Sequence, residues 1–194
     1  MVSQEKDIKE KILHATVELI IKHGDTSKIT VREIAAGAGV AIGLINYHFQ
    51  TKDNLISLCT LEIIRHSIEQ LGTMNENVKT EPIDQMKTLG RGITEFMVMN
   101  PGVSRISITR DFVSADAVDN SVQVVKMFSP IARKICGNDM SDQDLHVLLH
   151  MLVSSIEAAF LRKDVMKESF GIDLDNAEQR DHLVDFCIDR LFSK

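Results

Sequence analysis

The sequence predicts an all-α fold of about nine helices, and three observations lead to this prediction. The 194 residues include only 3 Pro, 1 Tyr and no Trp, a composition that favours helix over strand. Apolar residues recur at steps of three and four along most of the chain, and no stretch of useful length alternates as a strand would. With 44% hydrophobic and 26% charged residues, the chain has the composition of a globular protein with a sizeable core.

The first three helices are expected between residues 6 and 50. Residues 6–23 carry one apolar stripe, which Gly24 ends. Thr30 and Glu33 have the spacing of a capping box, so a short helix should begin at Val31 and end near Ala36, before two glycines. The third helix follows them and contains the apolar residues Val40, Leu44, Ile45 and Phe49.

The remaining helices are marked by caps and breakers. Thr51 can cap a helix that ends at residues 72–74, and a polar linker at residues 75–81 leads to Pro82, which suits a helix start. The triplet Asn100-Pro101-Gly102 should end that helix. Further helical segments are expected at residues 103–112, 118–136, 141–170 and 176–192.

Residues 31–45 have the pattern of a helix-turn-helix. Ala35 is small enough for two helices to cross closely, and Gly39 can adopt the left-handed backbone of a tight turn. Ile34, Val40 and Ile45 are apolar at the positions that set the angle between the helices. The second helix of such a motif enters the DNA major groove. An ordinary helical hairpin within a bundle is the alternative.

The same region resembles the DNA-binding domain of TetR-family transcriptional regulators, over residues from about 9 to 61. The resemblance is carried by residues 30–35, 39–40, 46–49 and 52–55. It implies a helix-turn-helix DNA-binding domain at residues 1–50 and a helical ligand-binding and dimerisation domain at residues 51–194, with residues 51–74 as a connecting helix. It also implies a homodimer, paired through its last two helices, that binds a palindromic operator. Such regulators are more often repressors, and a small effector releases them. The three widely spaced cysteines are expected to be reduced thiols, which favours a cytoplasmic protein.

Ten residues are candidates for DNA contact. Thr30 and Lys52 lie at expected helix starts, where free amides and a cation can hold a phosphate, although Lys52 also suits a solvated position. Arg32 suits a bidentate contact to guanine or phosphate, and equally a solvated surface. Family positions similar to Tyr47 and His48 contact the DNA backbone, and packing is their alternative. The full set is Thr30, Arg32, Ala41, Ile42, Gly43, Leu44, Asn46, Tyr47, His48 and Lys52.

The expected recognition helix departs from the family pattern. Ala41 stands where members often carry a capping Ser or Thr, and residues 41–50 contain no Lys or Arg. Base recognition would then depend on contact between Ile42 or Leu44 and thymine methyls, on Asn46, and on close approach at Gly43. This predicts a target richer in A·T. A protein-interaction module that no longer reads DNA is the alternative.

The C-terminal region is rich in methionine, with seven of the 9 Met between residues 74 and 151 and phenylalanines among them. Thioethers and aromatic rings suit a cavity for an apolar effector. The alternative is that these residues only fill the core of a helical bundle. The candidate ligand-binding residues are Met86, Phe96, Met97, Phe112, Met127 and Phe128.

We expect no enzyme, cofactor or membrane segment. Asp142, His146 and His150 share a helix face, which leaves a metal site conceivable, but a fourth ligand is lacking. No nucleophile elbow, phosphate loop or ligand-spaced cluster supports catalysis, and the three cysteines have no CxxC spacing. The longest uncharged stretch, residues 34–51, contains three glycines and several polar residues, so we do not expect it to span a membrane.

The net charge of −6 is unevenly distributed. Residues 1–55 hold seven Lys or Arg and seven Asp or Glu, so the whole excess of acid lies beyond them. The acidic total therefore does not argue against nucleic-acid binding by the N-terminal region. The zero net charge of residues 1–55 predicts few phosphate contacts and a shallow dependence of DNA binding on salt concentration.

Overall fold

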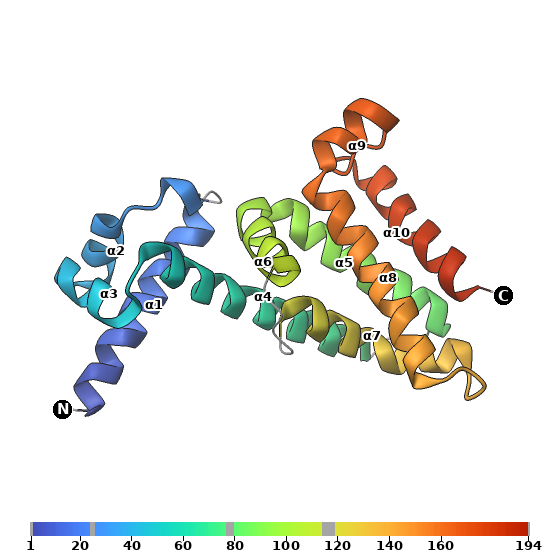
Figure 1. Ribbon diagram of the computed structural model, residues 1–194, viewed down its shortest axis with the longest axis horizontal. Coiled ribbons are helices and arrows are strands. Elements are labelled where there is room, and N and C mark those ends of the chain that lie inside the picture. The colour runs from blue at the N-terminus through green and yellow to red at the C-terminus, as the bar shows by residue number, and fades with distance from the viewer. Residues whose placement is uncertain (1, 24–25, 77–79, 114–118, 194) are drawn as a thin grey trace. The chain divides into compact units, whose positions relative to one another are not determined.

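The computed structural model describes residues 2–23, 26–76, 80–113 and 119–193, and their regular structure is entirely helical (Figure 1). They form ten α-helices and one short 3-10 helix, against about nine helices expected. The elements are α1 (Val2–His23), η1 (Thr26–Lys28), α2 (Val31–Ala38), α3 (Ile42–Phe49), α4 (Lys52–Glu76), α5 (Pro82–Met99), α6 (Pro101–Val113), α7 (Asn120–Cys136), α8 (Asp142–Leu161), α9 (Lys163–Phe170) and α10 (Ala177–Phe192).

Two differences from the sequence expectation have local causes. The segment at residues 141–170 is two helices, because the backbone leaves helical geometry at Arg162 (φ −109°, ψ 23°). Helix α6 begins at Pro101 rather than at residue 103, since proline at a first helical position needs no amide donor. Part of the expected linker, residues 77–79, lies outside the described residues.

The chain divides into two compact units, and the boundary lies inside α4. The first comprises residues up to Ile64 together with Asn100–Ser107, and the second comprises Arg65–Met99 and Ile108 onward. The expected boundary was at residue 50. The first unit extends further because Leu55 and Cys59 of α4 and Val103 of α6 are buried in its core.

The core of the first unit lies among α1, α2, α3 and the start of α4 (Figure 1). Its fully buried members include the apolar stripe of α1 and one face each of the two short helices: Ile12, Ile20, Ile29, Ile34, Ile45, Phe49 and Leu55. Gly37 lies against α1, since a Cβ at Gly37 would stand 3.3 Å from the Ala15 Cβ. The helix-turn-helix is therefore part of a closed core that it shares with α1 and the start of α4.

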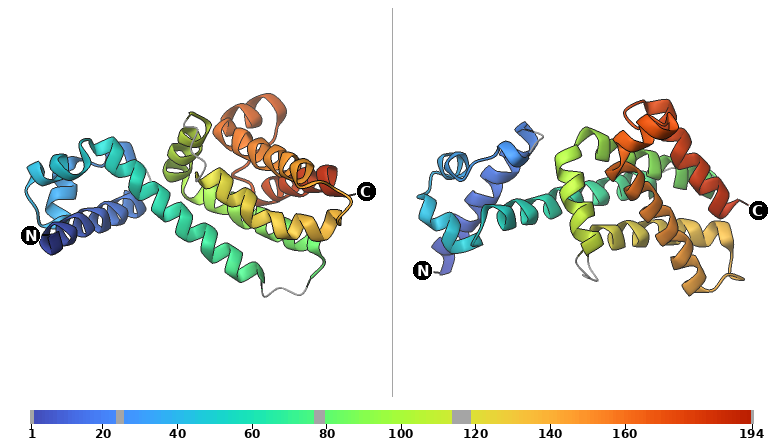
Figure 2. Two further views of the ribbon diagram at one scale, coloured as in Figure 1. Left: turned by 60° about the horizontal axis from the view of Figure 1, so that its bottom comes forward. Right: turned by 45° about the horizontal axis from the view of Figure 1, so that its top comes forward.

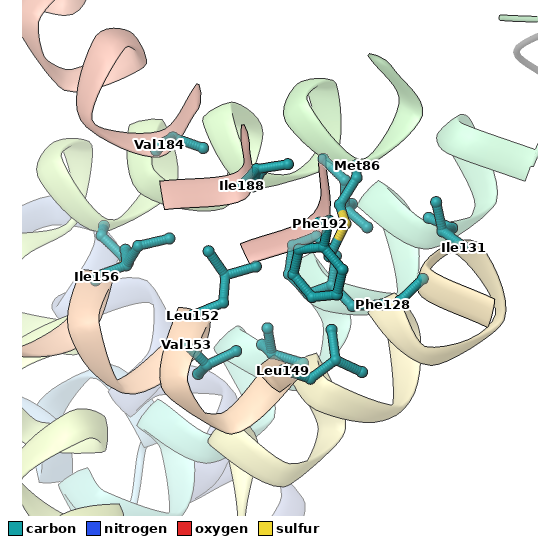
Figure 3. Packing of buried hydrophobic residues seen from close by; sticks show 14 of the residues in the cluster. Met86, Phe128, Ile131, Leu149, Leu152, Val153, Ile156, Val184, Ile188 and Phe192 are labelled. Atoms are coloured by element: carbon teal, nitrogen blue, oxygen red, sulfur yellow. The ribbon is translucent and has the colours of Figure 1, made fainter. Parts of the chain in front are cut away.

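The second unit packs α5, α7, α8 and α10 against one another (Figure 2). Met86, Phe128 and Leu152 come from three of these helices and point toward a common centre (Figure 3). Lys87 of α5 is 2.7 Å from Asp189 of α10, and Arg91 of α5 pairs with Asp185 of α10. The two charged pairs flank an apolar contact between α5 and α10.

Helix α8 is the one described helix with the length and apolar composition needed to cross a membrane. The longest uncharged stretch, residues 34–51, is not a single helix, because it contains the end of α2, the turn and all of α3. In α8, Leu145, Leu149 and Leu152 are at most 1% exposed and belong to the core of the second unit. Burial within the protein thus accounts for part of the apolar character of α8, while Val147 and Met151 of the same helix are exposed.

Gly90 makes the contact between α5 and α10 possible, and replacing it should destabilise the second unit. A Cβ at Gly90 would lie 2.7 Å from Val184 Cγ1, which is closer than packed atoms allow. We expect Gly90→Ala to lower the free energy of unfolding by about 1–3 kcal/mol, measured by urea denaturation.

Gly92 is the matched control, because it lies on the same helix. A Cβ there would meet only the end of the Leu71 side chain at 3.0 Å, which can rotate away. Gly92→Ala should therefore change the free energy of unfolding by no more than about 1 kcal/mol. Equal losses in the two variants would contradict this account of the α5–α10 contact.

Candidate nucleic-acid interface and effector cavity

Helix α2 begins with the capping box that the sequence predicts. The Thr30 hydroxyl accepts a hydrogen bond from the Glu33 amide at 3.2 Å, and the Thr30 amide donates to the Glu33 carboxylate at 2.8 Å. The hydroxyl of Thr30 also donates to that carboxylate at 2.8 Å, and these bonds lower the pKa of Glu33. Thr30 is exposed but already engaged, so a phosphate there would have to exchange with Glu33.

The turn between α2 and α3 depends on Gly39, as expected. Its φ of 65° and ψ of 35° lie in the left-handed region that glycine adopts without strain. The Val40 amide donates to the Ala35 carbonyl at 3.0 Å across this turn. Ile34 and Ile45 are 0% exposed on the two helices, which fixes their packing, and Val40 is partly buried beside them.

Helix α3 turns an uncharged face outward. Ile42 is 42% exposed and Tyr47 is 72% exposed, and Gly43 and Asn46 are exposed between them. Ala41 precedes the helix and its side chain makes no capping hydrogen bond, in agreement with the sequence analysis. Among the other candidates, Leu44 and His48 are partly buried, and the Tyr47 and His48 rings meet edge to face with centroids 5.0 Å apart.

The candidate cations differ in their surroundings. Arg32 is exposed on α2, whereas the Lys52 ammonium donates to the Ile29 carbonyl at 3.1 Å. Lys52 therefore links the start of α4 to the residue before the capping box and keeps two further N–H donors. Thr51 caps α4 as predicted, since its hydroxyl accepts from the Asn54 amide at 3.1 Å. Their contact with DNA stays a prediction.

Gln50 is a further candidate for DNA contact, which the sequence did not indicate. It is exposed at the end of α3 with φ 65°, the one non-glycine residue with positive φ in the described chain. The Asn54 side chain donates to the Phe49 carbonyl at 3.0 Å and so holds the link from α3 to α4. No sequence signal marks Gln50, because side chains with a Cβ rarely adopt this backbone.

The second unit contains a cavity of about 270 Å³ between the end of α6, the start of α7 and α8. Of the six predicted ligand residues, Phe112 lines it. Met86, Met97 and Phe128 are buried in the closed core, and Phe96 and Met127 are partly buried outside this lining. The lining consists of Asp111, Phe112, Asp119, Ser121, Val122, Val125, His146, His150, Ser154 and Glu157.

Two carboxyls in this cavity share one hydroxyl. Ser121 Oγ lies 2.7 Å from Glu157 Oε1 and 3.1 Å from Asp111 Oδ2. A hydroxyl has one hydrogen, so both contacts are hydrogen bonds only when one carboxyl is protonated and donates to the serine oxygen. Burial, and to a smaller extent the nearby charges of Asp111 and Asp119, raise the pKa of Glu157 to about 7 against the lowering effect of the Ser121 hydrogen bond. Glu157 is therefore the group that holds the proton near neutral pH.

The sequence contains a signal for Glu157 that the sequence analysis did not use. It is the only Asp, Glu, Lys or Arg between Asp144 and Arg162, in an otherwise apolar helix. A lone carboxyl in such a stretch costs free energy to bury unless it is bonded or protonated.

The three residues considered as metal ligands are not brought together. Asp142 accepts a hydrogen bond from Arg133 at 2.5 Å, and His146 and His150 are exposed at the cavity lining. Among the described residues, no three His, Cys, Asp or Glu side chains are grouped to hold a metal ion. All three cysteines are free thiols, and burial raises the pKa of Cys59 to about 12.

The raised pKa of Glu157 predicts how stability depends on pH. Its folded pKa of about 7 exceeds the ordinary value of 4.5, so its stabilising protonation is complete below 4.5 and lost as the pH rises through 7. Between pH 5 and 8 the unmodified protein should lose about 2–3 kcal/mol more unfolding free energy than Glu157→Gln, measured by urea denaturation at each pH. Glu168→Gln, at an exposed glutamate on α9, should behave like the unmodified protein. Parallel curves for the unmodified protein and Glu157→Gln would contradict the assignment.

Sequence comparison with known proteins finds a family match within the first unit. Residues 12–59 match the sequence model of the family described as bacterial regulatory proteins, tetR family. The chain is 26% identical over 101 residues to BetI, an HTH-type transcriptional regulator of Stenotrophomonas maltophilia (strain R551-3). That alignment covers 52% of this chain and about half, 51%, of BetI.

Solved structures extend the likeness in fold to nearly the whole chain. A TetR transcriptional regulator from Rhodococcus sp. RHA1 superposes with a TM-score of 0.64 at 18% identity, covering 98% of both chains. The fatty acid degradation regulator FadR from Bacillus halodurans gives a TM-score of 0.57 at 16% identity, covering 95% of this chain and 97% of its own. Residues 12–59, which include the helix-turn-helix with its capping box and left-handed glycine turn, are thus similar to bacterial regulatory proteins of the tetR family, and the fold of nearly the whole chain is similar to that of solved TetR regulators.

Proposed function

We propose that this chain is a cytoplasmic, ligand-responsive repressor that binds a palindromic operator as a homodimer. The observation that carries this proposal is the exposed face of α3 on a closed helix-turn-helix core, within the residues that match the family. A recognition helix held this rigidly can enter a major groove without rearrangement. Two copies related by a twofold axis would bind two half-sites.

The apolar surface of α8 and α10 supports dimerisation through these helices. Val147 and Met151 of α8 are 58% and 49% exposed, and Phe186 of α10 is 49% exposed. Large apolar side chains exposed on neighbouring helices are typical of an interface that a second subunit covers. We infer that a second copy of this chain packs there.

The cavity lined by Glu157 is the place where we propose that the effector binds. Phe112, Val122 and Val125 supply apolar wall in the cavity, which suits an effector with an apolar body. The carboxyls of Asp111 and Glu157 add a polar end. An effector with an apolar body and one group able to hydrogen-bond a carboxyl would suit both the apolar wall and the carboxyls.

Binding to DNA is tested through Tyr47. The duplex of highest affinity is selected from a random library with the full chain in the absence of effector, and affinities are measured by gel shift. Tyr47→Ala should weaken binding by about tenfold or more, because a hydrogen bond to a phosphate is lost. Phe170→Ala is the matched control, since Phe170 is 68% exposed on α9. If no duplex is selected by a folded dimer, the chain is an interaction module that does not read DNA.

Dimerisation is tested through Met151. Met151→Asp should convert the dimer to a monomer, because the charge would be buried without a partner in the proposed interface. Size-exclusion chromatography with light scattering measures the mass. Val165→Asp, at a 38% exposed apolar residue of α9, should leave the dimer intact. A monomeric unmodified protein, or a Met151→Asp dimer, would rule out this interface.

A further inference from the structure

The outward face of α3 carries an apolar side chain and an amide side chain, at positions where a helix that reads bases commonly carries charged side chains. Ile42 occupies the first position of α3 and is 42% exposed, and the exposed Asn46 lies one turn later on the same face. No Lys or Arg occurs between Arg32 and Lys52. The bidentate cation contact that most often reads guanine is therefore not available from α3.

Gly43 leaves room beside Ile42. A Cβ built on Gly43 would meet no atom within 4 Å, and its backbone is not in the left-handed region. Neither packing within the chain nor backbone conformation therefore requires a glycine at this position. A glycine at the start of a recognition helix allows base edges and the helix backbone to approach closely.

The structure separates Ile42 from the other apolar residues of α3. Ile45 and Phe49 are buried in the core of the first unit, and Leu44 is partly buried. The sequence left Ile42 and Leu44 as equal candidates for contact with thymine. Exposure favours Ile42, since a side chain must project from the helix to reach the floor of the groove.

We propose that α3 recognises A·T base pairs by packing Ile42 against thymine C5-methyl groups, while the Asn46 amide bonds the N6 and N7 edge of adenine. Thymine is the base that presents a methyl group in the major groove, and adenine is the base whose edge matches an amide. This inference rests on the proposed function, because it assumes that α3 enters the major groove.

Replacing thymine by uracil in the selected duplex tests the methyl contact directly. Uracil lacks the C5-methyl group and keeps the hydrogen-bonding groups of thymine. One uracil at the contacted position of each half-site should weaken binding by the unmodified chain about fourfold per methyl. In Ile42→Ala the same uracils should change affinity by less than about twofold, because the side chain that contacts the methyl is gone.

Ile21→Ala is the matched control. Ile21 is an exposed isoleucine (66%) of the same unit that belongs to α1 and not to α3. This variant should bind the selected duplex as tightly as the unmodified chain and keep the full uracil effect. Loss of the uracil effect in Ile21→Ala as well would overturn the assignment to Ile42.

Gly43→Ala gives a second, independent readout. The open space at Gly43 predicts unchanged or slightly raised thermal stability, since alanine is the better helix former. Affinity for the selected duplex should nevertheless fall, because the added methyl would occupy the space that the base edges need. Unchanged affinity in Gly43→Ala would contradict the close approach.

The outcomes separate this inference from the function on which it rests. Tight binding that ignores uracil at every thymine of both half-sites, or a selected site with guanine or cytosine throughout, would overturn thymine recognition and leave the regulator intact. Failure of a folded dimer to select any duplex would overturn both. A uracil effect that disappears specifically in Ile42→Ala would establish the contact.

Discussion

The burial of Ile34 and Ile45 in one core, on the two helices joined by the left-handed turn at Gly39, is the constraint on which the N-terminal unit depends. Both side chains are 0% exposed, so neither helix can rotate without opening the core. Since successive side chains of a helix point in different directions, burying Ile45 and Phe49 also decides which residues of α3 face outward. The composition of the reading face is thus a consequence of how the core is packed.

The elements around α3 are held by bonds that do not use its outward face. Lys52 donates to the Ile29 carbonyl, Thr30 and Glu33 close the start of α2, and Asn54 holds the end of α3. These contacts fix both ends of the motif, and the side chains of Ile42 and Asn46 are exposed outside them. The outer face can therefore change in sequence with little effect on stability.

Features governed by local chemistry could be predicted from the sequence, and features governed by tertiary contact could not. The capping box at Thr30, the turn at Gly39 and the helix start at Pro82 each depend on a few adjacent residues, and all three are present. The interruption at Arg162 and the positive φ of Gln50 carry no composition signal. The methionines and phenylalanines were equally compatible with a core or a cavity, because periodicity shows that a residue is buried but not whether an empty volume adjoins it.

In the cavity where we propose that the effector binds, binding would be coupled to the protonation of two carboxyls. Ser121 can satisfy both Asp111 and Glu157 only while one of them carries a proton. A neutral apolar ligand would displace water, further disfavour the charged carboxyl and hold that proton more tightly. A ligand that brings a hydrogen-bond donor would replace the proton and release it on binding. The direction of proton exchange on binding, measured in buffers of different ionisation enthalpy, therefore reports the chemistry of the effector before its identity is known.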